Sequence, residues 1–175
     1  ALGWAVEIPN LDSVKRGLVQ MRKIYNDGPI GFNGLALNTK KPPLDDLRVR
    51  KALQFLMNRP LLIKKLYFNE YEPLTSYYQG GTYENRGNEV YPYDPVGAVD
   101  LLKQAGWAAV NPEGYRVRGG RVLEFEVVYE SPLTERALTP YQEECKKAGV
   151  KLNLQMRTPA DRWKSLQGKE YEISS

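Results

Sequence analysis

The chain has 175 residues, with 25 Lys and Arg against 21 Asp and Glu, a formal charge of +4, no His and a single Cys. This length suffices for one compact core, and no apolar run approaches the ~20 residues that a membrane-spanning helix needs. Without His, the Ser-His and Cys-His nucleophile pairs and the Cys/His metal sites are excluded, and the lone Cys145 cannot form an internal disulfide.

The first forty residues predict two short strands separated by a helix. Residues 5–8 are typical of a strand, and Asn10 or Asp12 can cap a helix that follows. Residues 31–38 then predict a second strand that contains glycines, which are typical of bends and bulges in strands. Glycines recur here at intervals of three, but no helix opens after them, which argues against a phosphate-binding loop.

A pair of helices follows between residues 42 and 66. Two prolines hold the chain extended, and Asp45 or Asp46 can cap the first helix. Asn58 can cap the second helix, in which Pro60 is tolerated because it falls in the first turn. The apolar positions that recur at helical spacing in the first helix are Val49, Ala52, Leu53 and Leu56. We also expect Arg48 or Arg50 to pair with Asp45 or Asp46 in a structural role.

Residues 71–93 form a long stretch rich in Tyr, Gly and Asn with no periodic pattern. A loop of this length is usually functional or disordered, and the aromatic content argues against disorder. We therefore expect an ordered, packed loop.

The second half alternates helices and strands. A helix capped by Asp94 ends before Gly106, and a hairpin joins strands 115–118 and 121–129 through two glycines. A helix over 134–148 with a restart at Pro140, a strand over 150–156 and a helix over 158–166 follow. Such short crossovers predict parallel strands with helices between them.

Three phrases carry a resemblance to a known family. They read NTKKPP at 38–43 leading into DLRVRKAL at 46–53, YDP at 93–95 followed by a helix and AGW at 105–107, and KKAGV at 146–150. These phrases resemble the signature of extracellular solute-binding proteins of the peptide-binding family that serve ABC importers. Asn58 stands where the family usually has Asp, which keeps the capping chemistry and removes a charge. The pattern of Tyr71, Ser76 and the tyrosines after it looks most like the subgroup associated with microcin-type and other oligopeptides.

The resemblance implies an α/β fold, one lobe of a type II periplasmic-binding-protein fold with a mixed sheet flanked by helices. Residues 1–175 would then be a single lobe, the C-terminal-lobe fragment of a larger two-lobed protein, with both ends truncated. It implies a noncatalytic lobe without cofactor or metal that contributes half of a cleft for a peptide or similar solute. The implied partners are the first lobe of the same chain and an ABC permease, and the implied location is periplasmic or extracellular with a membrane anchor, as in a lipoprotein.

Five residues are candidates for the cleft. They are Asn38, Thr39, Ser76, Tyr77 and Tyr78. Asn38 and Thr39 end a predicted strand, and the other three bring a hydroxyl and amphipathic rings that can line a cleft. Each has a structural alternative, because Asn38 can satisfy backbone groups in the step to Pro42 and the tyrosines can pack on the lobe's own core.

Two other classes of protein compete with this interpretation. An enzyme would need an activated nucleophile or facing carboxylates, whereas the adjacent acidic pairs at 45–46 and 143–144 do not face one another on a helix. A basic α/β module that binds nucleic acid is the alternative, favoured by the charge and the tyrosines. It would need cations and aromatic rings on one surface, but most tyrosines fall in a loop flanked by Glu. We therefore expect neither catalysis nor a nucleic-acid partner.

Overall fold

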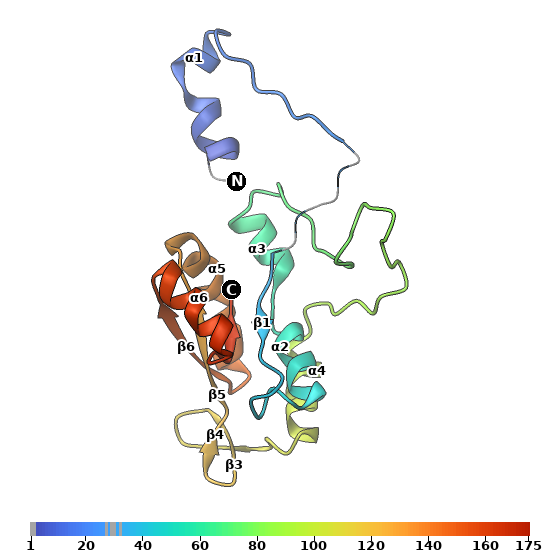
Figure 1. The fold of residues 1–175 in the computed structure, drawn as a ribbon, viewed down its shortest axis with the longest axis vertical. Helices are drawn as coiled ribbons and strands as arrows, with labels where there is room; N and C mark the ends of the chain where they lie inside the picture. The colour runs from blue at the N-terminus through green and yellow to red at the C-terminus, as the bar shows by residue number, and fades with distance from the viewer. Residues whose placement is uncertain (1–2, 27, 29–30, 32) are drawn as a thin grey trace. The chain divides into compact units, whose positions relative to one another are not determined.

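The computed structural model describes residues 3–26, 28, 31 and 33–175. The chain divides into two compact units (Figure 1). Unit 1 comprises Ala1–Phe32 and Arg59–Val90, and unit 2 comprises Asn33–Asn58 and Tyr91–Ser175. A single lobe spanning 1–175 stays a prediction.

Unit 2 is built around a four-stranded mixed sheet with the strand order β1-β7-β5-β6. Its strands are β1 (Ala36–Leu37), β5 (Glu124–Tyr129), β6 (Lys151–Met156) and β7 (Ile173–Ser174). Strand β5 runs parallel to both β6 and β7, and β1 runs antiparallel to β7. The predicted α/β fold with a mixed sheet is therefore confirmed.

Two helices make the crossovers between the parallel strands. They are α5 (Pro132–Lys147), between β5 and β6, and α6 (Pro159–Gly168), between β6 and β7. Ser131 caps α5 by accepting a hydrogen bond from the N–H of Leu133, and Thr158 caps α6 by accepting one from Asp161.

The predicted helix restart at Pro140 is wrong, because α5 continues through that residue. A proline inside a helix removes one N–H donor and costs about 3 kcal/mol. Side chains on both sides of the proline, Leu138, Tyr141 and Cys145, are buried in the core. Their burial offsets the local cost and keeps the two halves of the helix in line.

Helices α2 (Leu47–Phe55) and α4 (Pro95–Gln104) form the other helical part of unit 2. Asp46 caps α2 by accepting a hydrogen bond from the N–H of Arg48 at 2.8 Å, and Asp94 caps α4 by accepting one from Gly97 at 2.9 Å. Asp46 also pairs with the Arg48 guanidinium at 2.6 Å, which confirms the predicted pairing of one arginine with a nearby carboxylate.

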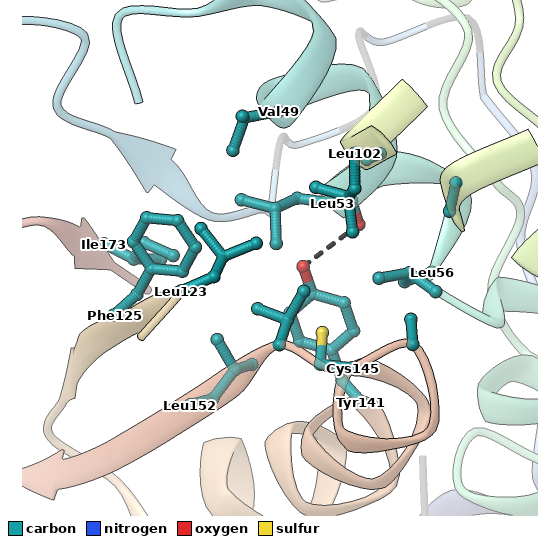
Figure 2. Packing of buried hydrophobic residues seen from close by; sticks show 14 of the residues in the cluster. Val49, Leu53, Leu56, Leu102, Leu123, Phe125, Tyr141, Cys145, Leu152 and Ile173 are labelled. Carbon is teal, nitrogen blue, oxygen red and sulfur yellow. Dashed lines mark hydrogen bonds between the residues drawn. The ribbon is translucent and has the colours of Figure 1, made fainter. Parts of the chain in front are cut away.

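The core lies between these helices and the sheet (Figure 2). Residues from α2, α4, α5 and three strands meet there, and the figure labels Val49, Leu53, Leu56, Leu102, Leu123, Phe125, Tyr141, Cys145, Leu152 and Ile173. The Tyr141 hydroxyl donates a hydrogen bond to the Leu53 carbonyl at 3.0 Å, so the one polar group of this ring is satisfied inside the core. Val128, whose side chain alternates with those of Val127 and Tyr129, is also buried, so the second face of β5 is covered at this end of the strand.

A second, three-stranded sheet contains β2 (Ala109–Val110), β3 (Arg116–Arg118) and β4 (Arg121–Val122). The predicted hairpin turn is present, with φ of 57° at Gly119 and 76° at Gly120. The predicted strand 121–129 is divided at Leu123, whose N–H donates to Arg116 and whose carbonyl accepts from Lys151. Leu123 thus passes the chain from the small sheet to the large one.

Unit 1 differs most from the sequence-based expectations. Its helical elements are η1 (Gly3–Glu7), η2 (Ile8–Asn10), α1 (Asp12–Lys15) and α3 (Arg59–Lys65). The predicted strand over residues 5–8 is wrong, since these residues form helical turns and Val6 is exposed. The predicted strand over 31–38 is reduced to β1, and its part at Phe32 lies outside the described residues.

Helix α3 begins directly after Asn58, as predicted. Residues 66–94 form neither helix nor strand, so the expected long loop is confirmed.

Replacing Arg116 by Ala tests how the small sheet is attached. Arg116 is 6% exposed and donates to the carbonyls of Ala148 at 2.7 Å and Trp107 at 2.9 Å. We expect the free energy of unfolding to fall by roughly 2–4 kcal/mol, because both acceptors would lose a charged donor. Urea denaturation measures this change. Arg121→Ala, at an exposed site in the same sheet, is the control and should change stability by less than about 0.5 kcal/mol.

Candidate ligand-binding site

The parallel strands of unit 2 end at one edge of the sheet. Tyr129 and Met156 are paired at the ends of β5 and β6, and Ser174 is paired with Val128 at the end of β7. Helices α5 and α6 begin at the same edge, because each follows its strand within a few residues. In α/β sheets, ligands bind outside the carboxyl ends of the strands. We call this region, comprising Glu130, Arg157, Arg162, Ser174 and Ser175, the carboxyl edge.

Arg162 connects three parts of the carboxyl edge. Its Nε donates to the Ser174 hydroxyl at 3.2 Å, and its Nη1 donates to Glu130 Oε2 at 3.3 Å. Its Nη2 donates to the carbonyl of Ser175. The guanidinium, which belongs to α6, therefore holds the ends of β5 and β7 in a fixed relation.

Arg157 makes a second connection on the β6 side. Its backbone N–H donates to the Tyr129 carbonyl at 2.8 Å, and its guanidinium pairs with Glu126 Oε1 at 2.7 Å. These partners are about one-third exposed, and such pairs contribute at most about 1 kcal/mol. Exposed apolar groups lie on the same elements, with Met156 58% and Trp163 61% exposed. The edge thus combines charged hydrogen-bonding groups with apolar surface.

Asn38, a predicted site residue, lies at the opposite end of β7. Its backbone N–H donates to Glu172 at 2.8 Å, and its side-chain amide donates to the carbonyls of Lys169 at 3.1 Å and Tyr171 at 2.9 Å. These contacts fasten the turn that leads from α6 into β7. Thr39 follows in an exposed turn. Contact of either residue with a ligand stays a prediction.

The other three predicted site residues lie in unit 1, in the 71–83 loop. Ser76 is buried, and its Oγ accepts a hydrogen bond from the N–H of Asn85 at 3.2 Å. The rings of Tyr77 and Tyr78 are 5.1 Å apart with an interplanar angle of 72°, and those of Tyr78 and Tyr83 are 6.2 Å apart at 65°. All three rings are more than half exposed. They form an edge-to-face aromatic cluster at the surface of unit 1.

Polar side chains of the loop bind its own backbone. Gln79 Oε1 accepts from the N–H and the hydroxyl of Thr75, at 2.7 and 3.2 Å. Asn88 Nδ2 donates to the Thr75 carbonyl at 2.8 Å, and Asn85 donates to Asn88 at 2.7 Å. Gly80 takes a positive φ of 79° in the turn after the tyrosine pair, a conformation that favours glycine. Side-chain hydrogen bonds therefore replace a strand ladder in this loop.

The sequence analysis missed the residues of the carboxyl edge. Glu130, Arg157, Arg162 and Ser174 belong to no motif that was singled out. A signal was nevertheless available, because the predicted strand and helix alternation implies parallel strands, and polar residues directly after such strands share an edge.

The single thiol lies in the hydrophobic core of unit 2. Cys145 is fully buried, and burial raises the pKa of its thiol to about 12. A thiol with so high a pKa is a poor nucleophile at neutral pH. Among the described residues, no group of three or more His, Cys, Asp or Glu side chains is arranged to hold a metal ion. Across the same residues, no helix has the length and apolar character required to cross a bilayer.

The mixed sheet with helical crossovers belongs to the periplasmic-binding-protein fold, which solved structures share with this chain. The chain belongs to family 5 of the bacterial extracellular solute-binding proteins, because residues 4–175 match the middle region of that family.

Individual relatives agree with this assignment. The chain is 35% identical over 102 residues to the nickel-binding periplasmic protein of Escherichia coli, a match that covers 58% of this chain and 20% of that protein. The structure of NikA from Brucella suis in complex with Fe(III)-EDTA shares the fold, with a TM-score of 0.74 and 23% identity over 80% of this chain and 29% of that one. The oligopeptide-binding protein AppA from Bacillus subtilis, solved with a nonapeptide, has a TM-score of 0.70 and 19% identity over the same shares. The chain thus corresponds to one part of longer proteins.

Replacing Arg162 by Ala tests the organisation of the carboxyl edge. We expect a loss of roughly 1–2 kcal/mol in the free energy of unfolding, because the buried Ser174 hydroxyl loses its guanidinium donor. Urea denaturation gives the value, and Lys164→Ala, at an exposed site of the same helix, is the matched control. Equal, small effects of both variants would show that Arg162 does not organise the edge.

Proposed function

We propose that this chain is a noncatalytic ligand-binding lobe of an ABC-importer solute-binding protein, which contributes half of an inter-lobe cleft for a peptide or similar solute. The observation that carries the proposal is the family match along residues 4–175. The parallel-strand edge supports it, because this is where α/β lobes bind ligands. Binding of this kind requires fixed polar groups and apolar surface but no nucleophile.

We assign ligand contact in unit 2 to the carboxyl edge. Guanidinium groups such as those of Arg157 and Arg162 donate to carboxylates and carbonyls, and Glu130 can accept from amino groups. Trp163 adds exposed aromatic surface on the same helix as Arg162. A peptide offers each of these groups a complementary partner, namely its terminal charges, its backbone amides and its apolar side chains.

We also assign a ligand-facing role to Tyr77 and Tyr78. Their rings are exposed and held by edge-to-face contact, so they present apolar surface at a low cost in conformational entropy. Ser76 supports the loop beneath them through Asn85. Asn38 and Thr39 remain proposed contributors, Asn38 mainly through its hold on the start of β7.

The remaining features of the proposal rest on the family. They are delivery of the solute to an ABC permease, a second lobe in the same protein, a periplasmic or extracellular location with a membrane anchor, and a place in the oligopeptide or microcin subgroup. A metal complex is a second candidate solute, favoured by the name of the Escherichia coli relative.

The isolated chain should bind free peptides weakly or not at all, because one lobe buries only part of a ligand and cannot recover the entropy lost on association. Isothermal titration calorimetry with a peptide library and with nickel chelates measures this directly. Tight, saturable binding of a peptide to the isolated chain would contradict the half-cleft interpretation. Binding of a chelate in preference to every peptide by the two-lobed parent would favour the second candidate.

The double substitution Tyr77→Ala and Tyr78→Ala, made in the two-lobed parent, tests the aromatic contribution. We expect the dissociation constant for a bound peptide to rise about tenfold or more, since each lost ring removes buried contact area. The melting temperature should stay within a few degrees because both rings are exposed. Tyr25→Ala, at another exposed tyrosine of unit 1, is the control. Lost stability with unchanged affinity would remove both rings from the site.

A further inference from the structure

The chain leaves unit 2 after Asn58 and re-enters it at Tyr91, so residues 59–90 form a segment with both ends anchored in unit 2. The ends are close together. The N–H of Asp94 donates to the Phe55 carbonyl at 3.0 Å, and the rings of Phe55 and Tyr91 are 5.9 Å apart. The outgoing and returning chains therefore meet at the base of the 59–90 segment.

A cluster of polar side chains fastens this base to α5. The Tyr93 hydroxyl donates to Glu144 Oε2 at 2.5 Å, and the side chains of Tyr93 and Asn58 are also hydrogen-bonded. Lys147 holds the other oxygen of Glu144 at 2.8 Å. Asn58 belongs to the outgoing chain and Tyr93 to the returning chain, so a single phenol connects both to one carboxylate on α5. We call Asn58, Tyr93 and Glu144 the latch.

The protonation states of Tyr93 and Glu144 favour their hydrogen bond near neutral pH. The hydrogen bond to Glu144 raises the pKa of Tyr93 to about 12, so the phenol keeps its proton. The hydrogen bonds from Lys147 and Tyr93 lower the pKa of Glu144, so the carboxylate stays ionised. The Glu144 side chain is only 12% exposed. A charge-assisted hydrogen bond that is largely shielded from water is stronger than an exposed one.

The 59–90 segment buries few of its own residues. Its regular structure is the seven-residue helix α3, and its buried residues are Leu62 and Ser76. A segment with so few buried groups has a low free energy of local opening. Contacts at its two ends therefore contribute to its order.

We propose that the latch closes the base of the 59–90 segment, and that breaking it lets the segment open as one unit while the sheet and helices of unit 2 stay folded. Opening at the base loosens both anchored ends together, because the Tyr93 hydroxyl connects Asn58 of the outgoing chain with the returning chain. The latch acts whatever solute is bound. If the proposed function holds, the latch also governs how the segment presents Tyr77 and Tyr78.

The substitutions Tyr93→Phe and Glu144→Gln test the latch in the full chain. Tyr93→Phe removes the hydrogen bond and Glu144→Gln replaces its charged acceptor with a neutral one, and both nearly keep the shape of the side chain. We expect amide exchange in α3, where the Leu66 N–H donates to Leu62, to accelerate about tenfold. Tryptic cleavage after Lys64, Lys65 and Arg86 should accelerate similarly. Amides of β5 and β6 should exchange at the wild-type rate.

Glu143→Gln is the matched control, since Glu143 is exposed on the same helix and should leave all rates unchanged. The double variant Tyr93→Phe with Glu144→Gln should accelerate exchange no more than Tyr93→Phe alone, because the hydrogen bond that Glu144→Gln weakens is then already absent. The proposal is overturned if α3 exchange changes less than twofold, if β5 and α3 accelerate equally, or if the single effects simply multiply. Loss of folding in either single variant would equally refute a latch whose release leaves unit 2 intact.

Discussion

The arrangement of unit 2 depends on arginine side chains that donate to carbonyls at the ends of helices. Arg116 is buried and reaches both the Ala148 carbonyl, after α5, and the Trp107 carbonyl, after α4. Burial lowers the pKa of Arg116, which reflects the cost of removing a guanidinium from water. That cost is offset because the last carbonyls of a helix lack partners and carry the negative end of its dipole. The hairpin is thereby attached to both helices at once.

Hydrogen bonding to the carbonyls at helix ends also explains the roles of neighbouring residues. Arg48 donates to the Gln104 carbonyl at 2.7 Å and Arg118 to the Ala105 carbonyl at 2.8 Å, so three arginines converge on the chain at the end of α4. Gly149 is required beside them, because an added Cβ would lie 2.8 Å from Arg116 Cγ and its φ is +83°. These cations are engaged within the unit. These arginines contribute to the basic charge that suggested a nucleic-acid-binding module, but here they donate hydrogen bonds to carbonyls at helix ends. No observation favours the nucleic-acid-binding alternative.

Patterns with a local physical cause were predicted well from the sequence. The Asp46 and Asp94 caps, the glycine hairpin and the parallel pairing of β5 with β6 follow from turn chemistry and periodicity, and several ordered phrases indicated the family. Predictions failed where tertiary packing decides. Pro140 stays in a helix because its neighbours are buried, and Leu123 divides a strand because it bonds to two sheets. The carboxyl edge was missed for the same reason, since Arg162 and Glu130 meet only when the strands align.

Different interactions hold the two regions to which ligand contact is assigned, the carboxyl edge in unit 2 and the aromatic cluster in unit 1. The geometry of the carboxyl edge follows from strands whose inner face is part of the core, so their opening requires disruption of that core. The aromatic cluster belongs to a loop that is held by its own amide side chains, and contacts at the base of the segment include the phenol–carboxylate bond of Tyr93 and Glu144. A rigid edge favours a fixed recognition of groups common to all ligands, such as backbone and termini. A loop with few buried groups can adjust to variable side chains of a ligand. In a binding protein built this way, the edge would recognise the groups that all ligands share, and the loop would set the preference between solutes.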